Sequence, residues 1–126
     1  MIKKKILNPS RVRRIRGGFS FISHRFITDG FLASLGQKEL ILYLFLILAS
    51  DRFGLSFYSY DSICTLLELS LDEYTTSRNS LMDKDFIAFD GSVFQVLSLP
   101  EKKPVRRKRS TRSPVDTLIQ QTVKGF

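Results

Sequence analysis

The sequence has few of the residues on which covalent and metal chemistry depend. Its 126 residues include one cysteine, Cys64, and one histidine, His24. A single cysteine excludes an internal disulfide and a thiolate metal cluster, and it is typical of a reducing compartment. A cluster of histidine ligands is likewise excluded, and no Walker or dinucleotide-binding glycine motif is present. We therefore expect no catalytic residues, no cofactor, no metal site and no small-molecule substrate.

Long hydrophobic runs are also scarce. The longest run, Leu40 to Ala49, is about half as long as a bilayer-spanning helix. Near the N-terminus, the three lysines at positions 3–5 are followed by polar and basic residues, not by the apolar region of a signal peptide. These absences predict a soluble cytoplasmic protein without a membrane span. The 43% of hydrophobic residues suffices for the core of one small domain.

Positive charge is what the sequence has in excess, and it is concentrated at the two ends. The formal net charge is +8. Residues 1–35 contain eight Lys/Arg and one acid, whereas residues 36–99 contain four Lys/Arg and nine acids. Residues 100–126 contain eight Lys/Arg and two acids. The sequence thus predicts an acidic globule with a basic arm at each of its opposite ends.

Composition and turn signals divide the chain into five segments. They are a basic N-terminal arm (1–18), a Phe-rich segment packing on the core (19–35), a folded domain (36–99), a basic linker (100–114) and a short amphipathic C-terminal helix (115–126). The Phe-rich segment supplies five apolar anchors: Phe19, Phe21, Phe26, Phe31 and Leu32.

The folded domain begins with a helix predicted from Gln37 to Ser50, with Gly36 as its N-cap. This helix is apolar on nearly every face, so it needs cover from the Phe-rich segment or from a second subunit. Gly54 suits a left-handed cap at its C-terminal end. Residues 55–60 then read as a short strand. A second helix is expected over 60–68, with an inner face of Ile63, Leu66 and Leu67.

A third helix has the clearest start signal in the chain. Ser70 and Glu73 have the spacing of a capping box, which predicts a helix from Leu71 to about Lys84. Residues 85–99 follow as a hairpin, in which two runs rich in β-branched and aromatic residues flank Asp90-Gly91. That pair is preferred in two-residue primed turns.

The order helix, strand, helix, turn, helix, hairpin resembles winged helix-turn-helix domains of replication initiators and DnaD-type primosome proteins. It also resembles small helix-turn-helix proteins of bacterial mobile elements. The resemblance covers roughly Leu35 to Leu99, with Leu69-Ser70 at the family's turn, Leu81 at a core position and Phe86-Ile87 entering the wing. It implies an α+β fold with a three-helix core and a β-hairpin wing, in which helix 71–84 is the recognition helix.

The expected recognition helix departs from that family. Asp72 and Glu73 occupy positions where basic or amide side chains usually reach DNA, and phosphate repels carboxylates. Acids in the first turn also stabilise a helix N-terminus, which is the simpler role. The wing offers no alternative, because residues 86–99 contain no Lys or Arg. The side chains that stay candidates for recognition or docking are Thr75, Thr76, Arg78 and Asn79.

Arg78 is a second departure, because the family usually has an aliphatic residue facing the core at this position. A half-buried arginine needs compensation for its charge. We expect an ion pair with Glu68 or Asp61, or a docking role for the side chain.

The arms are the expected site of nucleic-acid binding. Guanidinium groups bind phosphate bidentately and stack on bases, and arginine-rich segments bind RNA or grip DNA without sequence preference. The predicted contact residues are Lys3, Lys4, Lys5, Arg11, Arg13, Arg14, Arg16, Lys102, Lys103, Arg106, Arg107, Lys108, Arg109 and Arg112. Two other roles stay open, namely tails that serve only solubility and tails drawn to an anionic membrane surface.

The C-terminal segment 115–126 has a one-sided apolar pattern that suits docking on a protein partner or on the chain's own core. Its docking residues would be Leu118, Ile119 and Val123. Together these features predict a non-catalytic nucleic-acid-binding accessory protein of a nucleoprotein complex, as in a mobile element. Its arms would hold the RNA or DNA backbone while its acidic core docks on protein or self-associates. The alternatives are a dimeric transcriptional or replication regulator reading duplex DNA with helix 71–84, and a protein-interaction adaptor.

Overall fold

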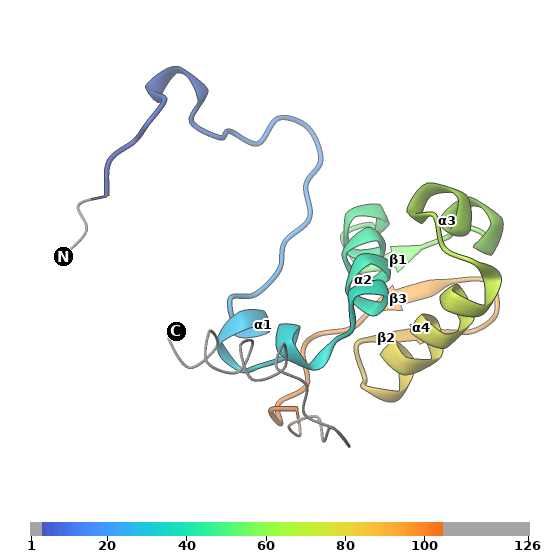
Figure 1. Cartoon of the computed structure of the whole chain (residues 1–126). Coiled ribbons are helices and arrows are strands. Elements are labelled where there is room, and N and C mark those ends of the chain that lie inside the picture. The colour runs from blue at the N-terminus through green and yellow to red at the C-terminus, as the bar shows by residue number, and fades with distance from the viewer. Residues whose placement is uncertain (1–3, 105–126) are drawn as a thin grey trace, which may run out of the picture.

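The computed structural model describes residues 4–104 of the chain. In this range, α-helices and a three-stranded antiparallel sheet give an α+β fold, in agreement with the class expected from the sequence (Figure 1). The elements in chain order are η1 (Pro9–Arg11), α1 (Arg25–Thr28), η2 (Leu32–Ser34), α2 (Gln37–Ala49), β1 (Leu55–Ser56), α3 (Tyr60–Leu67), α4 (Leu71–Asp83), β2 (Ile87–Phe89) and β3 (Phe94–Val96). The strand order in the sheet is β1-β3-β2.

Helix α2 begins after Gly36, as predicted, and ends one residue before the expected Ser50. It packs against α4, α3 and the sheet. One face of the helix is buried in these contacts, and its residues are Leu42, Tyr43, Leu46 and Ile47. Two residues of the opposite face, Ile41 and Leu48, are exposed although they are apolar. The core therefore covers only one side of a helix that is apolar on two sides.

The Phe-rich segment packs on the core with its second half only. Phe26 on α1 and Phe31 before η2 are buried and meet the ring of Phe86 edge-on, with centroids 6.2 and 5.7 Å away. Phe19 and Phe21, also expected to be anchors, are exposed. Both precede α1 and lie on the part of the chain that leads away from the core (Figure 1).

Helices α3 and α4 are joined by a short turn, as the sequence predicts. Glu68 ends α3 in a left-handed conformation (φ 54°), and Ser70 starts α4. The predicted inner face of α3 is wrong at Leu66, which is 61% exposed. Partly buried Cys64 takes its place, because the face that meets the core is centred between Ile63 and Leu67.

Gly54 has the left-handed conformation expected of it (φ 82°) but does not cap α2, which ends at Ala49 with Ser50 as its C-cap. It closes a turn into β1, and its carbonyl accepts a hydrogen bond of 2.8 Å from the Val96 amide. A side chain here would bring its Cβ within 2.6 Å of the Val96 carbonyl oxygen. Strand β1 is shorter than the predicted 55–60, because Ser59 caps α3 and the helix begins at Tyr60.

The predicted hairpin is present, but its turn is not the two-residue type. Phe89 pairs with Phe94, so four residues, 90–93, connect β2 to β3. The Asp90 carboxylate holds this wider loop by accepting hydrogen bonds of 2.8 Å from the amides of Ser92 and Val93. Such side-chain bonding to the following backbone is typical of aspartate in turns.

Candidate nucleic-acid interface

The N-terminus of α4 is fixed by its acidic residue Glu73. Its carboxylate accepts a hydrogen bond of 2.9 Å from the Ser70 amide, while the Ser70 hydroxyl accepts one of 3.1 Å from the Glu73 amide. The second carboxylate oxygen pairs with Lys38 on α2. The capping box is therefore confirmed, and Glu73 also ties α4 to α2. Asp72, beside it, is exposed.

A groove between the first turns of α2 and α4 lies beside this cap. It encloses about 520 Å³ and is lined by charged residues from both helices, including Glu39, Asp72, Glu73 and Lys38. Two of its three carboxylates are paired with lysines, Glu73 with Lys38 and Glu39 with Lys84. Asp72 is in none of the ion pairs found within residues 4–104, so the groove carries a small excess of negative charge, which disfavours phosphate along this half of α4.

Arg78 has a different environment from the one predicted. Among residues 4–104, the ion pairs found are Arg25–Asp29, Lys38–Glu73 and Lys84–Glu39, so the expected pair with Glu68 or Asp61 is not formed. The guanidinium lies over the rings of Tyr74 and Phe89 instead, 5.5 and 5.1 Å from their centroids. Burial raises the pKa of Tyr74, and the adjacent guanidinium of Arg78 opposes that rise.

The other candidate residues of α4 differ in exposure. Thr76 and Asn79 are exposed, whereas Thr75 is half-buried. Asn79 is also engaged, since its side-chain oxygen accepts hydrogen bonds of 3.3 and 3.1 Å from Arg78. The helix thus offers a small polar surface next to an acidic groove.

The basic residues of the N-terminal arm have a clear path to a ligand. Lys4, Lys5 and the four arginines between positions 11 and 16 are all exposed. The arm leads away from the helices and the sheet before it enters α1 (Figure 1). None of the ion pairs found within residues 4–104 joins this arm to an acid of residues 36–99.

The two arms leave the fold from the same side, although the sequence places them at opposite ends of the domain. Arg25 in α1 donates a hydrogen bond of 2.8 Å to the carbonyl of Pro100 and one of 2.7 Å to the Asp29 carboxylate. A few residues further on, Pro104 lies beside Gly30. Figure 1 shows the segment after β3 running back to α1 and η2. Residues 100–104, where the C-terminal arm starts, therefore lie beside α1, the first α-helix after the N-terminal arm.

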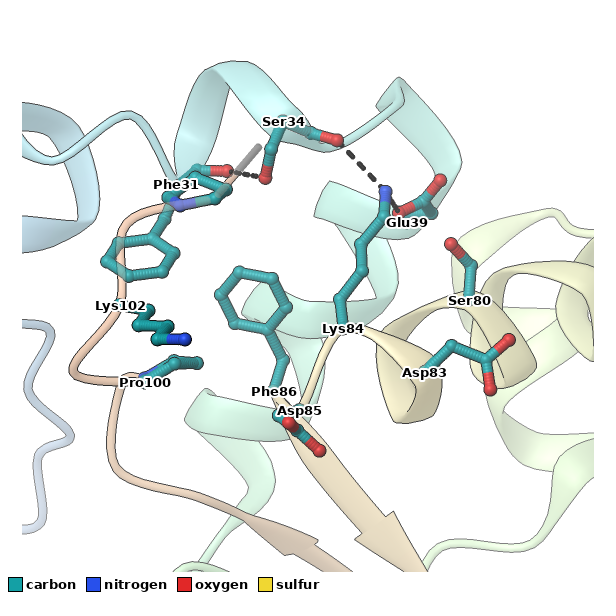
Figure 2. A pocket seen from close by; sticks show the side chains of 11 residues that line it. Phe31, Ser34, Glu39, Ser80, Asp83, Lys84, Asp85, Phe86, Pro100 and Lys102 are labelled. Atoms are coloured by element: carbon teal, nitrogen blue, oxygen red, sulfur yellow. Dashed lines mark hydrogen bonds and ion pairs between the residues drawn. The ribbon is translucent and has the colours of Figure 1, made fainter. Parts of the chain in front are cut away.

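A cavity of about 550 Å³ lies at the start of the C-terminal arm, between the end of α4, η2 and residues 100–104 (Figure 2). Lys84 crosses its rim, where its ammonium group donates to the carbonyl of Ser34 (2.9 Å) and pairs with Glu39 (2.8 Å). Asp83, Asp85 and Lys102 also line the cavity. Lys102 therefore lies at a cavity with carboxylates in its wall, and both Lys102 and Lys103 are exposed.

Several predicted residues lie outside the described range. Those of the arms are Lys3, Arg106, Arg107, Lys108, Arg109 and Arg112, and those of the C-terminal docking helix are Leu118, Ile119 and Val123. Sequence reasoning missed Arg25, which holds Pro100, at the start of the C-terminal basic linker, beside α1. Its only local signal is Asp29 at helical spacing.

Within residues 4–104, no helix is long and apolar enough to cross a membrane. Within the same range, no group of three or more His, Cys, Asp or Glu side chains could hold a metal ion. Comparisons with models of known families, with curated proteins and with solved structures gave no match for the chain.

Proposed function

We propose that this protein is a non-catalytic nucleic-acid-binding accessory protein whose basic arms hold the phosphate backbone. The observation that carries the proposal is the hydrogen bond from Arg25 to Pro100, which holds the start of the basic linker beside α1, one short segment (19–24) after the N-terminal arm ends. Two basic segments that leave the fold near one element can engage neighbouring stretches of a single strand or duplex. Each then raises the effective concentration of the other.

In this proposal, the core is a winged helix-turn-helix scaffold and α4 is not its reading element. The order of helices, strands and hairpin fits that layout. The acidic groove beside α4 and the lack of Lys or Arg in the hairpin both disfavour phosphate contact by the core. Sequence specificity would then come from a protein partner or from the shape of the nucleic acid.

The alternative with an observation in its favour is a regulator that reads duplex DNA through α4. Thr76 and Asn79 are exposed on that helix, and such side chains can contact base edges. Asn79 would first have to give up its hydrogen bonds with Arg78.

The test is a salt titration of the full chain with duplex DNA, single-stranded DNA and structured RNA. Arg11, Arg13, Arg14 and Arg16 are changed together to Gln, and Arg52→Gln in the core serves as the control. On duplex DNA, each lost phosphate contact lowers the slope of log K against log salt by about 0.9, so the quadruple variant should lose roughly three to four units. The control should keep the wild-type slope.

Equal slopes for the quadruple variant and the wild type would refute the role of the arm. A defined duplex site that disappears in Thr76→Ala with Asn79→Ala, while the arm variant still binds it, would favour the regulator. The adaptor role predicts no binding to any of the three nucleic acids.

A further inference from the structure

Helix α2 has a second apolar face, on the side away from the core. Ile41, Leu44, Phe45 and Leu48 have the spacing of one helical face, opposite the buried one. Ile41 is 43% exposed and Leu48 is 75% exposed, whereas the other two are half-buried. An apolar helix face that is left in water is typical of an interaction surface.

Tyr58, after β1, extends this face. Its ring packs edge-on against Phe45, with centroids 5.2 Å apart, and is still 45% exposed. We name these side chains the α2 stripe: Ile41, Leu44, Phe45, Leu48 and Tyr58.

We propose that the α2 stripe is a dimerisation surface that packs against the same stripe of a second copy. In a two-fold interface, a residue near the axis contacts the same residue of the second copy. A charged side chain at the centre would therefore lie against an identical charge. The stretch from Leu40 to Ser50 contains no charged residue. The centre of the stripe can therefore pack against a second copy without bringing like charges together.

The ends of α2 favour an antiparallel pair. Lys38 and Glu39 stand at the start of the helix, and Asp51 and Arg52 follow its end, so each end carries one acid and one base. The ends are therefore neutral in either orientation, and the antiparallel one also aligns the helix dipoles favourably. A second copy also brings an acidic core, with nine acids against four Lys/Arg, to a chain whose arms are basic. Charge complementarity thus points to a copy of this chain.

The exposed area of the stripe determines how tightly two copies are expected to bind. A buried aromatic side chain contributes on the order of 200 Å², so the exposed parts of Ile41, Leu48 and Tyr58 together offer roughly 300 Å². This is less than half of the area that each partner buries in a standard interface, about 800 Å². The expected dimer is therefore concentration-dependent and not obligate.

The test is sedimentation velocity of the full chain without nucleic acid, over a wide concentration range and at low and high salt. High salt screens contacts between arms and core but leaves apolar contacts in place. Leu48→Glu is compared with Leu66→Glu, a matched control on α3 that is 61% exposed and lies outside the stripe. The wild type should dimerise at both salt concentrations. Leu48→Glu should raise the dimer Kd by about a hundredfold or more, and the control by less than about twofold.

Circular dichroism melts establish that each variant is folded, and Ile41→Lys provides a second disruption of the stripe. A wild-type chain that is monomeric throughout the range would overturn the proposal, as would equal losses in Leu48→Glu and Leu66→Glu. Dimerisation that vanishes at high salt would assign it to the arms instead of the stripe. These outcomes do not depend on whether the arms bind nucleic acid.

Discussion

At the scale of single residues, charged side chains in this protein make contacts within the fold that their neighbours in the sequence do not indicate. Arg78 lies between two aromatic rings and not beside a carboxylate. A guanidinium is weakly hydrated and planar, so ring faces can compensate its partial burial. The sequence predicts that Arg78 is half-buried, but it does not predict the contact with Phe89, because that residue lies in the hairpin and not on the same helix.

Asp90 gives a prediction about pH. Hydrogen bonds from the amides of Val93 and Ser92 hold the pKa of its carboxyl below its usual value. A lowered pKa in the folded state means a stabilising contribution that is present above the unfolded-state pKa and is lost as the pH falls through the folded-state value. Wild type should thus melt at a higher temperature than Asp90→Ala near neutral pH. The difference should shrink below about pH 4.

Thermal melts of both proteins from neutral to acidic pH provide the measurement. Asp90→Asn is the matched control, because it retains a side-chain oxygen acceptor but cannot titrate. A gap between wild type and Asp90→Ala that stays constant down to the most acidic pH would contradict the assignment.

At the scale of elements, the parts predicted well are those with local signals. Helix α2 follows from its apolar run and Gly36, and α4 follows from the Ser70–Glu73 capping box. The turn of the hairpin was predicted wrongly, because Asp90-Gly91 fits both short and longer loops and only the pairing of Phe89 with Phe94 decides between them. The outer face of α2 could not be predicted, since periodicity does not tell which apolar side meets the core.

The turn between α3 and α4 carries a prediction about stability. Glu68 adopts a left-handed conformation (φ 54°), which costs an L-residue roughly 1–2 kcal/mol and a glycine almost nothing. Part of this gain is offset, because glycine increases the conformational entropy of the unfolded chain. Glu68→Gly should therefore raise the free energy of unfolding by about 0.5–1 kcal/mol, measured by urea denaturation.

Glu68→Ala is the matched control, because it removes the same carboxylate but keeps a Cβ in the left-handed conformation. It should be no more stable than the wild type. Equal gains in the two variants would assign the effect to the loss of charge instead of to the backbone.

At the scale of the whole molecule, the decisive contact joins residues 75 positions apart, Arg25 and Pro100. No local pattern could predict it, and for that reason the sequence suggested arms at opposite ends. In the proposed function, the contact would help to decide whether the two basic segments act on one ligand or on two. Its contribution can be separated from that of the charge that Arg25 carries.

Arg25→Lys keeps the positive charge but loses the planar fork that bridges the Asp29 carboxylate and the Pro100 carbonyl. The number of phosphate contacts should stay the same, so the salt slope should not change. Looser geometry should lower the effective concentration of the second arm and raise the Kd for nucleic acid roughly threefold to tenfold. Arg52→Lys is the control, and it should match wild type in both quantities. A fall in slope together with affinity would mean that phosphate contacts of an arm are lost with the bridge, whereas an unchanged Kd would mean that the arms act independently.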